Sequence, residues 1–230
     1  WNYPWLTAMN SIVAALLAGN TVILKHSTQT PLCAEDIIHC FQQAGLPEGV
    51  LQHLHLKHQQ CDKILKDPRI NYISFTGSTH AGMHIRKNIC DRLIPINLEL
   101  GGKDPAYVRA DADIDFTAEQ LCDGVFFNSG QSCCSVERIY IADKVFDHFV
   151  EAFAEHAKKL TLGNPWEQQT TLGPVINHTA KQLVQKQIHD ACQQGARAIL
   201  DEQSFSYAKS DNCYCAPQIL TQVTNDMDVM

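Results

Sequence analysis

The sequence has no apolar run long enough to cross a bilayer, and it has no cluster of positive charge. The longest apolar candidate, residues 12–18, is much shorter than the roughly 20 residues that a membrane-spanning helix needs. The chain carries 18 basic and 25 acidic residues, and no basic run is interleaved with aromatic residues. We therefore expect neither a membrane nor a nucleic acid as partner. A signal peptide, internal repeats and low-complexity segments are also not recognisable.

Cysteine, in contrast, is abundant, with ten residues at irregular spacing. Disulfide frameworks belong to small, loop-rich secreted domains, and a chain of 230 residues is not of that kind. We therefore expect reduced thiols in a cytoplasmic protein, many of them packed in the core. At least one of them should be chemically special.

The first hundred residues alternate between the apolar patterns of strands and helices. Thr30 followed by Pro31 predicts a helix N-terminus, with Thr30 as the capping residue. Such alternation is typical of an α/β fold with a parallel sheet covered on both faces. The sequence predicts helices at 6–17, 30–44, 61–65 and 79–89, and strands at 21–24, 50–56, 70–75 and 93–100.

The second part of the chain has longer amphipathic segments. Gly101 and Gly102 are the best candidates for a domain boundary, which predicts one domain over residues 1–101 and another over residues 102–230. Residues 201–212 are polar and are predicted to form a loop. In this part we expect helices at 113–127, 144–160 and 177–194, and strands at 138–142 and 196–200.

Residues 126–134 read Phe-Phe-Asn-Ser-Gly-Gln-Ser-Cys-Cys, where a predicted helix ends in small and polar residues directly before Cys133. A nucleophilic cysteine needs partial exposure and surroundings that favour the thiolate. A turn beside a helix end also offers free backbone N–H groups, which can hold an oxyanion. A structural cysteine in the core is the alternative, and the local sequence leaves both open.

Two further segments resemble binding or catalytic elements. Glu99 lies at the end of an apolar strand, directly before two glycines, and sites of α/β proteins form at the carboxyl ends of strands. A solvated charge at a strand end is the alternative. Residues 74–78, Ser-Phe-Thr-Gly-Ser, predict a strand, a tight turn and a helix start whose free N–H groups can bind a phosphate.

Taken together and in order, five motifs resemble the aldehyde dehydrogenase superfamily, over essentially the whole chain. The separation of 34 residues between Glu99 and Cys133 is also similar to that family's. The motifs are Trp-Asn-Tyr-Pro at 1–4, Gly-Asn-Thr-Val-Ile-Leu-Lys at 19–25, Phe-Thr-Gly-Ser-Thr at 75–79, Leu-Glu-Leu-Gly-Gly-Lys at 98–103 and Gly-Gln-Ser-Cys at 130–133.

The resemblance implies an enzyme that oxidises a small-molecule aldehyde to a carboxylic acid with NAD or NADP. Cys133 is then the nucleophile that forms a thiohemiacetal and later a thioester. The oxyanion is held by the Asn2 side chain and the Cys133 backbone N–H. Glu99 is the general base for the hydrolytic water. Cys134 is a structural neighbour, and Leu121, Phe126, Phe127 and Ser132 are expected to line the aldehyde path.

The resemblance also implies a Rossmann-like cofactor domain at 1–101, joined to an α/β catalytic domain at 102–230, both incomplete. Lys25 is expected to reach the adenosine ribose, Ser78 the pyrophosphate and Trp1 the cofactor cleft. Many relatives that prefer NAD have a glutamate at the position of Thr28, and its absence predicts that NADP is accepted. The expected cofactor-binding residues are Trp1, Lys25, Ser27, Thr28, Gly77, Ser78 and Leu100.

The segment at 53–61 departs from the family pattern, because histidines replace a glycine-rich turn. His53, His55, His58 and Cys61 suggest a metal site, but alternating strand residues face opposite sides, and we expect no metal. His53 and His55 are expected to share one sheet face, and His58 to lie in a loop near the cofactor.

By family standards we expect the chain to be an internal fragment of a protein that forms homodimers or homotetramers. The fragment itself is not expected to be fully active. An alternative function is a thiol esterase or acyl-transferase that uses Cys133 without hydride transfer. A non-enzymatic relative is disfavoured, because Asn2, Glu99 and Cys133 are all present.

Overall fold

A computed structural model describes residues 1–208 and 211–230 of the chain. The polypeptide divides into two compact units, Trp1–Gly101 and Gly102–Met230, called the first and the second unit below. Three strand pairs are parallel and one is antiparallel, and at least one α-helix lies between the two strands of each parallel pair. The fold is therefore of the α/β class, as the sequence predicted. None of the helices in the described residues is long and apolar enough to span a membrane.

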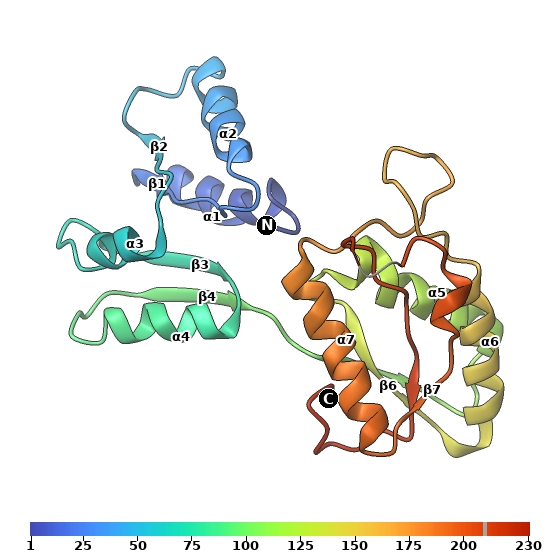
Figure 1. Cartoon of the computed structure of the whole chain (residues 1–230). Coiled ribbons are helices and arrows are strands. Elements are labelled where there is room, and N and C mark those ends of the chain that lie inside the picture. Colours follow the sequence, from blue (N-terminus) through green and yellow to red (C-terminus); the bar gives the residue numbers. More distant parts are fainter. Residues whose placement is uncertain (209–210) are drawn as a thin grey trace. The chain divides into compact units, whose positions relative to one another are not determined.

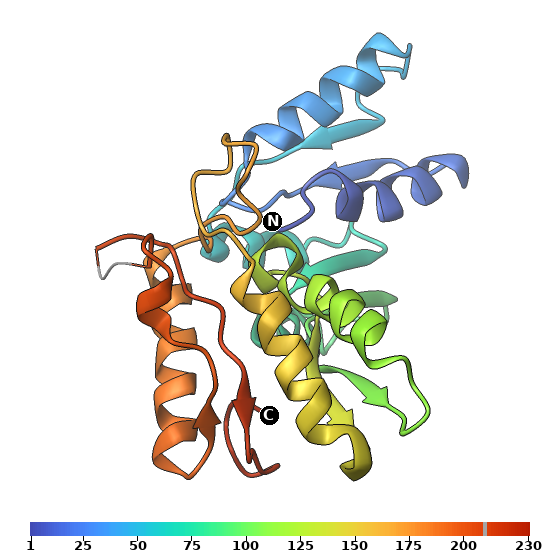
Figure 2. The ribbon, with the colours of Figure 1, turned by 90° about the vertical axis from the view of Figure 1, so that its right-hand side faces the viewer.

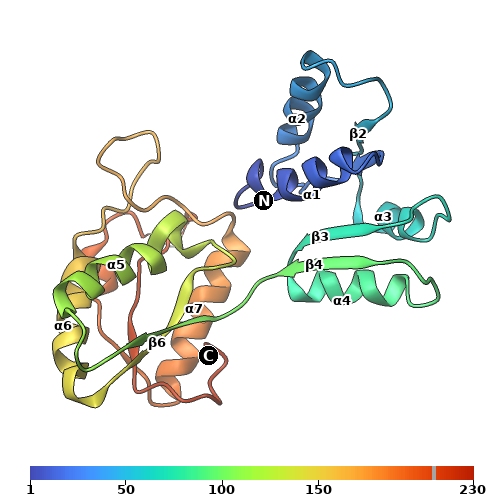
Figure 3. The ribbon, with the colours of Figure 1, turned by 180° about the vertical axis from the view of Figure 1, so that it is seen from behind.

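The first unit contains two parallel strand pairs with their helices (Figure 1). Strand β1 pairs with β2, and β3 pairs with β4. Helix α4 runs along the β3–β4 pair (Figures 1 and 3). The elements are α1 (Leu6–Leu17), β1 (Val22–Leu24), α2 (Leu32–Gln43), β2 (Leu51–His53), α3 (His58–Leu65), β3 (Ile73–Gly77), α4 (Thr79–Asn88) and β4 (Ile96–Leu100).

The core of the first unit's β1–β2 pair is formed by Ile12 of α1, Ile37 and Ile38 of α2, and Leu51 of β2, all buried. Apolar side chains at helical spacing on α1 and α2 thus pack around a strand, as an amphipathic pattern predicts. This packing fixes α2 against β2, which matters for the cluster discussed below.

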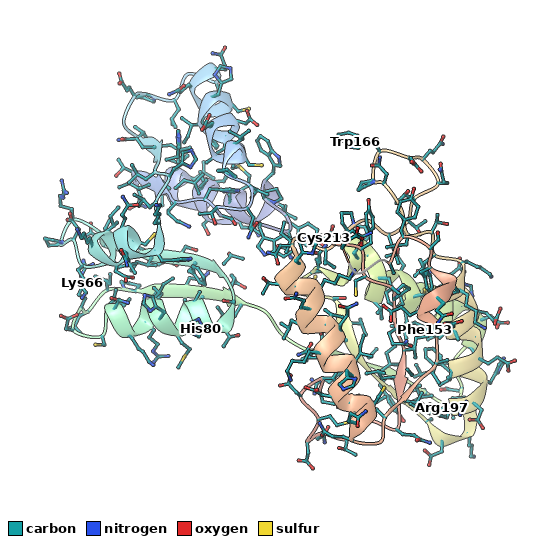
Figure 4. The ribbon with its side chains drawn as sticks, viewed as in Figure 1. Lys66, His80, Phe153, Trp166, Arg197 and Cys213 are labelled. Atoms are coloured by element: carbon teal, nitrogen blue, oxygen red, sulfur yellow. The ribbon has the colours of Figure 1, made fainter. Side chains whose placement is uncertain are left out.

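The second unit joins β5 (Asp104–Val108) and β6 (Val136–Ile141) in a parallel pair. Helices α5 and α6 pack against each other and share a core in which the rings of Phe149 and Phe153 stack, with centroids 5.5 Å apart (Figure 4). The remaining elements are α5 (Ile114–Phe126), η1 (Phe127–Gly130), η2 (Asp143–Val145), α6 (Phe146–Lys158), α7 (His178–Gln193), β7 (Arg197–Ala198), η3 (Glu202–Ser204) and β8 (Leu220–Thr221).

A loop after α6 projects from the second unit (Figure 2). The backbone N–H of Gly163 donates to the carbonyl of Leu172 at 3.0 Å and closes the base of the loop. Trp166 near its tip is 94% exposed (Figure 4).

Several predicted elements are wrong in extent. The strand expected at 50–56 is only β2, because β1 ends at Leu24 and leaves residues beyond Leu54 without a ladder partner. The strand expected at 93–100 begins at Ile96, opposite the start of β3. Helix α3 begins at His58 rather than at residue 61, so His58 lies in a helix and not in a loop.

Other expectations fail for local reasons. Strand β5 was not predicted, because it contains Pro105, which the ladder tolerates at a register shift between Asp104 and Pro105. Thr30 does not cap α2: its hydroxyl has no hydrogen-bond partner among the described residues. The predicted burial of many cysteines is also wrong. All ten are free, and only Cys122 is buried.

Candidate active site

Cys133 lies in a tight turn between α5 and β6, in the second unit. Its side chain is exposed. The turn is closed by the backbone N–H of Ser135, which donates to the carbonyl of Ser132 at 3.3 Å. Within residues 1–208 and 211–230, the backbone N–H of Cys133 makes no hydrogen bond. An exposed thiol beside a free N–H is the arrangement that a nucleophile with an oxyanion donor requires.

The chain reaches this turn through three consecutive residues with positive φ. Asn128 and Ser129 have φ of 52° and 57°, and Gly130 has φ of 73°. The left-handed region is costly for serine, so the surroundings must hold it there. The Ser129 hydroxyl donates to the carbonyl of Gly173 at 2.9 Å, and the Asn128 side-chain amide donates to the carbonyl of Gln131 at 3.2 Å.

Gln131 ties the turn to a segment more than 40 residues away. Its Oε1 accepts the backbone N–H of Ile176 at 2.8 Å. Its Nε2 donates to the carbonyl of Asn128 at 3.1 Å and to that of Pro174 at 3.4 Å. Together with the Ser129 bond to Gly173, these contacts hold the turn against residues 173–176. The sequence motif contained Gln131, but its partners could not be predicted from the sequence.

Buried Ser135 holds the other side of the turn. Its hydroxyl oxygen lies 2.9 Å from the carbonyl of Val125 and 3.3 Å from that of Gly124, the last carbonyls of α5. The Ser135 hydroxyl thereby donates to backbone carbonyls at the helix end, which have no partner within the helix. The Cys133 turn is therefore anchored on both sides, and nothing in the local sequence had marked Ser135 for this role.

Cys134 is exposed, as Cys133 is, whereas Cys122 is buried. The Cys134 sulfur lies 3.2 Å from the hydroxyl of Ser132, which also accepts the Cys134 backbone N–H at 3.4 Å. Cys122 lies in the core on α5, where burial, with a smaller contribution from the charge of Asp123, raises its pKa to about 11. A thiol with such a pKa stays protonated and inert, so Cys122 is structural.

The residues expected along the aldehyde path are only partly accessible. The ring of Phe126 stacks on Phe153 at 6.2 Å in the core, so Phe126 packs inward and is not free to contact a substrate. Leu121 also packs against this core. Phe127, in contrast, is 57% exposed on the segment that leads to Cys133.

Glu99 lies in the first unit, one residue before the end of β4. It pairs with Thr76 of β3, and the next pair is Leu100 with Gly77. Its carboxylate is exposed and accepts the Asn97 side-chain amide at 3.4 Å. The strand-end position predicted for Glu99 is thus present, at the carboxyl edge of two parallel strands.

Ser78 caps α4, directly after β3. Its hydroxyl accepts the backbone N–H of Ala81 at 3.2 Å. Close packing of this helix on the strand depends on Gly82, where a Cβ atom would lie 2.8 Å from the side chain of Leu100. The strand, turn and helix start predicted around Gly77 and Ser78 are therefore present. The backbone N–H groups of such a helix start can bind a phosphate group.

A pocket of about 310 Å³ lies beside the end of β1. Ser27 and Thr28 line it from one segment, and the segment after β2 lines it from another. Lys25 directly follows β1. The residues around the pocket are His26, Ser27, Thr28, Pro31, His55, Leu56, Lys57 and Gln60.

The pocket offers hydroxyl groups together with basic side chains, and Thr28 brings no carboxylate. Burial lowers the pKa of His26, and the charges of Lys25 and His55 lower it further. His26 is thus neutral near pH 7. A phosphorylated ribose meets no acidic group among the residues that line this pocket.

Asn2 and Trp1 lie in the irregular segment before α1. The Asn2 side-chain oxygen accepts the backbone N–H of Tyr3 at 3.1 Å, and Trp1 is 40% exposed. Of the predicted site residues, the first unit therefore groups Ser27 with Thr28 at the pocket, and Gly77 and Ser78 with Glu99 and Leu100 at the strand ends. Cys133 belongs to the second unit.

Comparison with known proteins shows which family this chain resembles. The model of the aldehyde dehydrogenase family matches residues 1–230. D-glyceraldehyde dehydrogenase (NADP(+)) of Picrophilus torridus is 34% identical, over 98% of this chain and 46% of that protein. Retinaldehyde dehydrogenase 3 of Homo sapiens is also 34% identical, over 100% of this chain and 44% of that protein.

Among solved structures, NADP-dependent glyceraldehyde-3-phosphate dehydrogenase from Bacillus halodurans, complexed with NADP, is 36% identical. The two structures match with a TM-score of 0.90, and the match covers 99% of this chain and 46% of that chain. The chain spans about half the length of the curated relatives it matches. Since the family model matches every residue, the chain belongs to the aldehyde dehydrogenase family.

Proposed function

We propose that the protein oxidises an aldehyde to a carboxylic acid with NADP⁺ or NAD⁺, and that Cys133 is its nucleophile. The observation that carries the proposal is the exposed Cys133 thiol, in a turn fixed by Gln131 on one side and Ser135 on the other. Family membership supports the reaction type, and the names of several relatives specify NADP.

In the first step, the Cys133 thiolate attacks the aldehyde carbon and forms a thiohemiacetal. The negative charge that develops on the former carbonyl oxygen needs fixed donors. The backbone N–H of Cys133 is one donor, and the family resemblance assigns the Asn2 side-chain amide as the other.

NADP⁺ or NAD⁺, held by the residues of the first unit named below, would supply the hydride acceptor needed to convert the thiohemiacetal to a thioester. Water then hydrolyses the thioester, releasing the carboxylic acid and the free Cys133 thiol. The resemblance assigns Glu99 as the base that takes a proton from this water. Glu99 is exposed at the end of its strand, where water can reach its carboxylate.

The residues of the first unit fit a dinucleotide. Lys25, Ser27 and Thr28 supply donors to the adenosine ribose, and Trp1 is assigned to the cofactor cleft. The helix start at Ser78, beside Gly77 and Leu100, supplies N–H groups to the pyrophosphate. Because Thr28 carries no charge, a 2′-phosphate is not repelled there, and Lys57 on the same pocket adds a positive charge.

The relatives have names that refer to different aldehydes, glyceraldehyde and retinaldehyde among them. We therefore propose the substrate only as a small-molecule aldehyde. A homo-oligomeric and cytoplasmic enzyme remains part of the proposal, on the family resemblance alone.

The test uses the full-length protein and a panel of aldehydes, with NADP⁺ and NAD⁺ in parallel. The Cys133→Ala variant should lose NAD(P)H production, while the matched Cys134→Ala variant should retain it within a few-fold. Undiminished NAD(P)H production by Cys133→Ala would overturn the mechanism.

A thiol esterase that uses the same cysteine is the alternative. It predicts Cys133-dependent hydrolysis of activated esters without cofactor, and no NAD(P)H from any aldehyde. The Ser27–Thr28 pocket favours the dehydrogenase, since a pure hydrolase has no use for a nucleotide-binding pocket.

A further inference from the structure

A cluster of three potential metal ligands lies in the first unit, on the segment that departs from the family pattern. It consists of Glu35, His53 and His55, and is called the histidine cluster below. One ligand atom from each residue lies within 4.8 Å of the other two. In the part of the chain that the structure describes, no other group of three such residues comes this close.

We propose that the histidine cluster binds a divalent transition-metal cation of the zinc type. Two imidazoles and one carboxylate form a donor set that suits Zn²⁺, and a water molecule completes four-coordination. Glu35 and His53 have no part in the proposed oxidation of aldehydes, whereas His55 also lines the pocket proposed for the adenosine ribose, so metal binding is tested without cofactor.

The geometry is already close to that of a metal site. The Nε2 atom of His55 lies 3.0 Å from Oε1 of Glu35. Donor atoms of a tetrahedral zinc site with metal–ligand distances of about 2.0–2.1 Å are roughly 3.3 Å apart. No separation in the cluster therefore has to close by more than about 1.5 Å, which side-chain rotations can supply.

The two histidines lie close together at the end of β2. His53 is the last residue of β2, and His55 follows two residues later, in the segment beyond the strand. Their ring centroids lie 4.9 Å apart at an interplanar angle of 63°. The sequence argument against a metal compared histidines on a single strand and omitted the third ligand, which comes from another element.

That third ligand is held on a rigid helix. Glu35 lies in the first turn of α2, whose buried residues Ile37 and Ile38 pack against Leu51 of β2 (Figure 1). Because the hydrophobic contact fixes α2 against β2, it also fixes Glu35 near the two histidines. Sites built on regular elements keep their ligands in place better than sites on loops.

The cluster is open to solvent and to an incoming ion. The side chains of His55 and Glu35 are 43% and 53% exposed. A second pair of similar type, His84 with Asp62 at 2.8 Å, supplies only two ligands. Two ligands bind a cation much more weakly than three, so His84 provides an internal comparison.

The test titrates the purified full-length protein with Co²⁺, followed by absorption, and then displaces Co²⁺ with Zn²⁺. Cobalt is needed because ten free cysteines compete for zinc, and thiolate ligands add a charge-transfer band that nitrogen and oxygen ligands lack. We expect one equivalent of Co²⁺ with ligand-field bands and no thiolate band.

His53→Gln and His55→Gln should each weaken the binding of this equivalent by at least about tenfold, and Glu35→Gln should weaken it similarly. His39→Gln, an exposed histidine on the same helix α2, is the matched control and should bind as the wild type does. Circular dichroism verifies that each variant is folded.

If the variants fail to fold, spectra of the wild-type protein test the same proposal. In nitrogen-detected spectra of the imidazoles of the full-length protein, of which residues 1–230 contribute 11, Zn²⁺ should shift the resonances of His53 and His55 and leave that of His84 unchanged. Binding only through thiolates, unchanged affinity in the His53 and His55 variants, or shifts confined to other histidines would each overturn the proposal.

Discussion

Replacing Gln131 with methionine removes the hydrogen bonds that hold the Cys133 turn while keeping the length of the side chain. The backbone N–H of Ile176 then loses its acceptor at 2.8 Å, and the carbonyl of Asn128 loses a donor at 3.1 Å. An N–H group left without a partner in a half-buried site costs about 1–2 kcal/mol. The melting temperature should therefore fall by roughly 4 °C.

The expected loss of activity is larger than the loss of stability. Asn128 and Ser129 are held in the left-handed region by contacts of the same turn, and the turn relaxes when Gln131 no longer ties it to residues 174–176. A displacement of about 1 Å at the nucleophile can cost about 100-fold in rate. We expect kcat/KM for the best aldehyde to fall by about 10- to 100-fold, mainly through kcat.

Two further variants separate positioning from general destabilisation. Gln131→Glu keeps the acceptor for Ile176 but cannot donate to the carbonyls of Asn128 and Pro174, so its kcat should lie between those of the wild type and Gln131→Met. Gln169→Met, the control, removes an exposed bond to Glu167 at 2.9 Å and should leave kcat/KM unchanged.

The rate of Cys133 alkylation by iodoacetamide, followed by mass spectrometry, reports on the turn without any substrate. It should change in Gln131→Met and stay constant in Gln169→Met. If Gln131→Met keeps kcat/KM within twofold of wild type, the hydrogen bonds of Gln131 do not position the nucleophile.

Three other predictions concern Glu99, Thr28 and Cys122. Glu99→Gln should release about one equivalent of NAD(P)H in a burst and then turn over about 10²- to 10⁴-fold more slowly, because thioester hydrolysis loses its base; an unchanged steady state would refute this role. Thr28→Glu should lower kcat/KM for NADP⁺ by at least about tenfold, with little change for NAD⁺, since a carboxylate repels the 2′-phosphate; equal losses with both cofactors would argue against that position. The folded-state pKa of Cys122 is raised to about 11 from an ordinary value of 9.0. Its contribution to stability is therefore complete below pH 9 and is lost as the pH rises toward 11, by at most about 2–3 kcal/mol. Urea denaturation at pH 8 and pH 10.5 should show a smaller loss in Cys122→Ala than in wild type, and equal losses would contradict the assignment.

The starts of helices α4, α5 and α7 were predictable because their signals are local. Ser78, Asp113 and Asn177 stand directly before helices in the sequence, and each accepts a backbone N–H three residues further on. Thr30 looked equally suitable, yet its hydroxyl is buried without a partner among the described residues. The signal identifies a helix start, while the surrounding packing decides whether the side chain serves as the cap.

Interactions between distant segments could not be predicted in the same way. The β5–β6 pair joins Asp104 to Val136 and contains a proline that normally argues against a strand. The bond between Gln131 and Ile176 spans 45 residues, and that between Glu35 and His55 spans 20. Neither leaves a period or a motif in the sequence, because each depends on how two elements pack.

The sequence motif before Cys133 nevertheless contains residues whose backbone conformation is unusual for their residue type. Asn128 and Ser129 occupy the left-handed region, where a serine is uncommon. Gly130, which adopts this conformation readily, is only the third residue of the run. Such strain persists only where the surroundings over-determine the conformation, and here Gly173, Pro174 and Ile176 supply those contacts. The strained turn directs the chain from the end of α5 to an exposed Cys133, whereas Cys122, in the regular part of the same helix, is buried and inert. The difference between buried Cys122 and exposed Cys133, the proposed nucleophile, therefore follows from backbone conformation, which the segment at 173–176 helps to maintain.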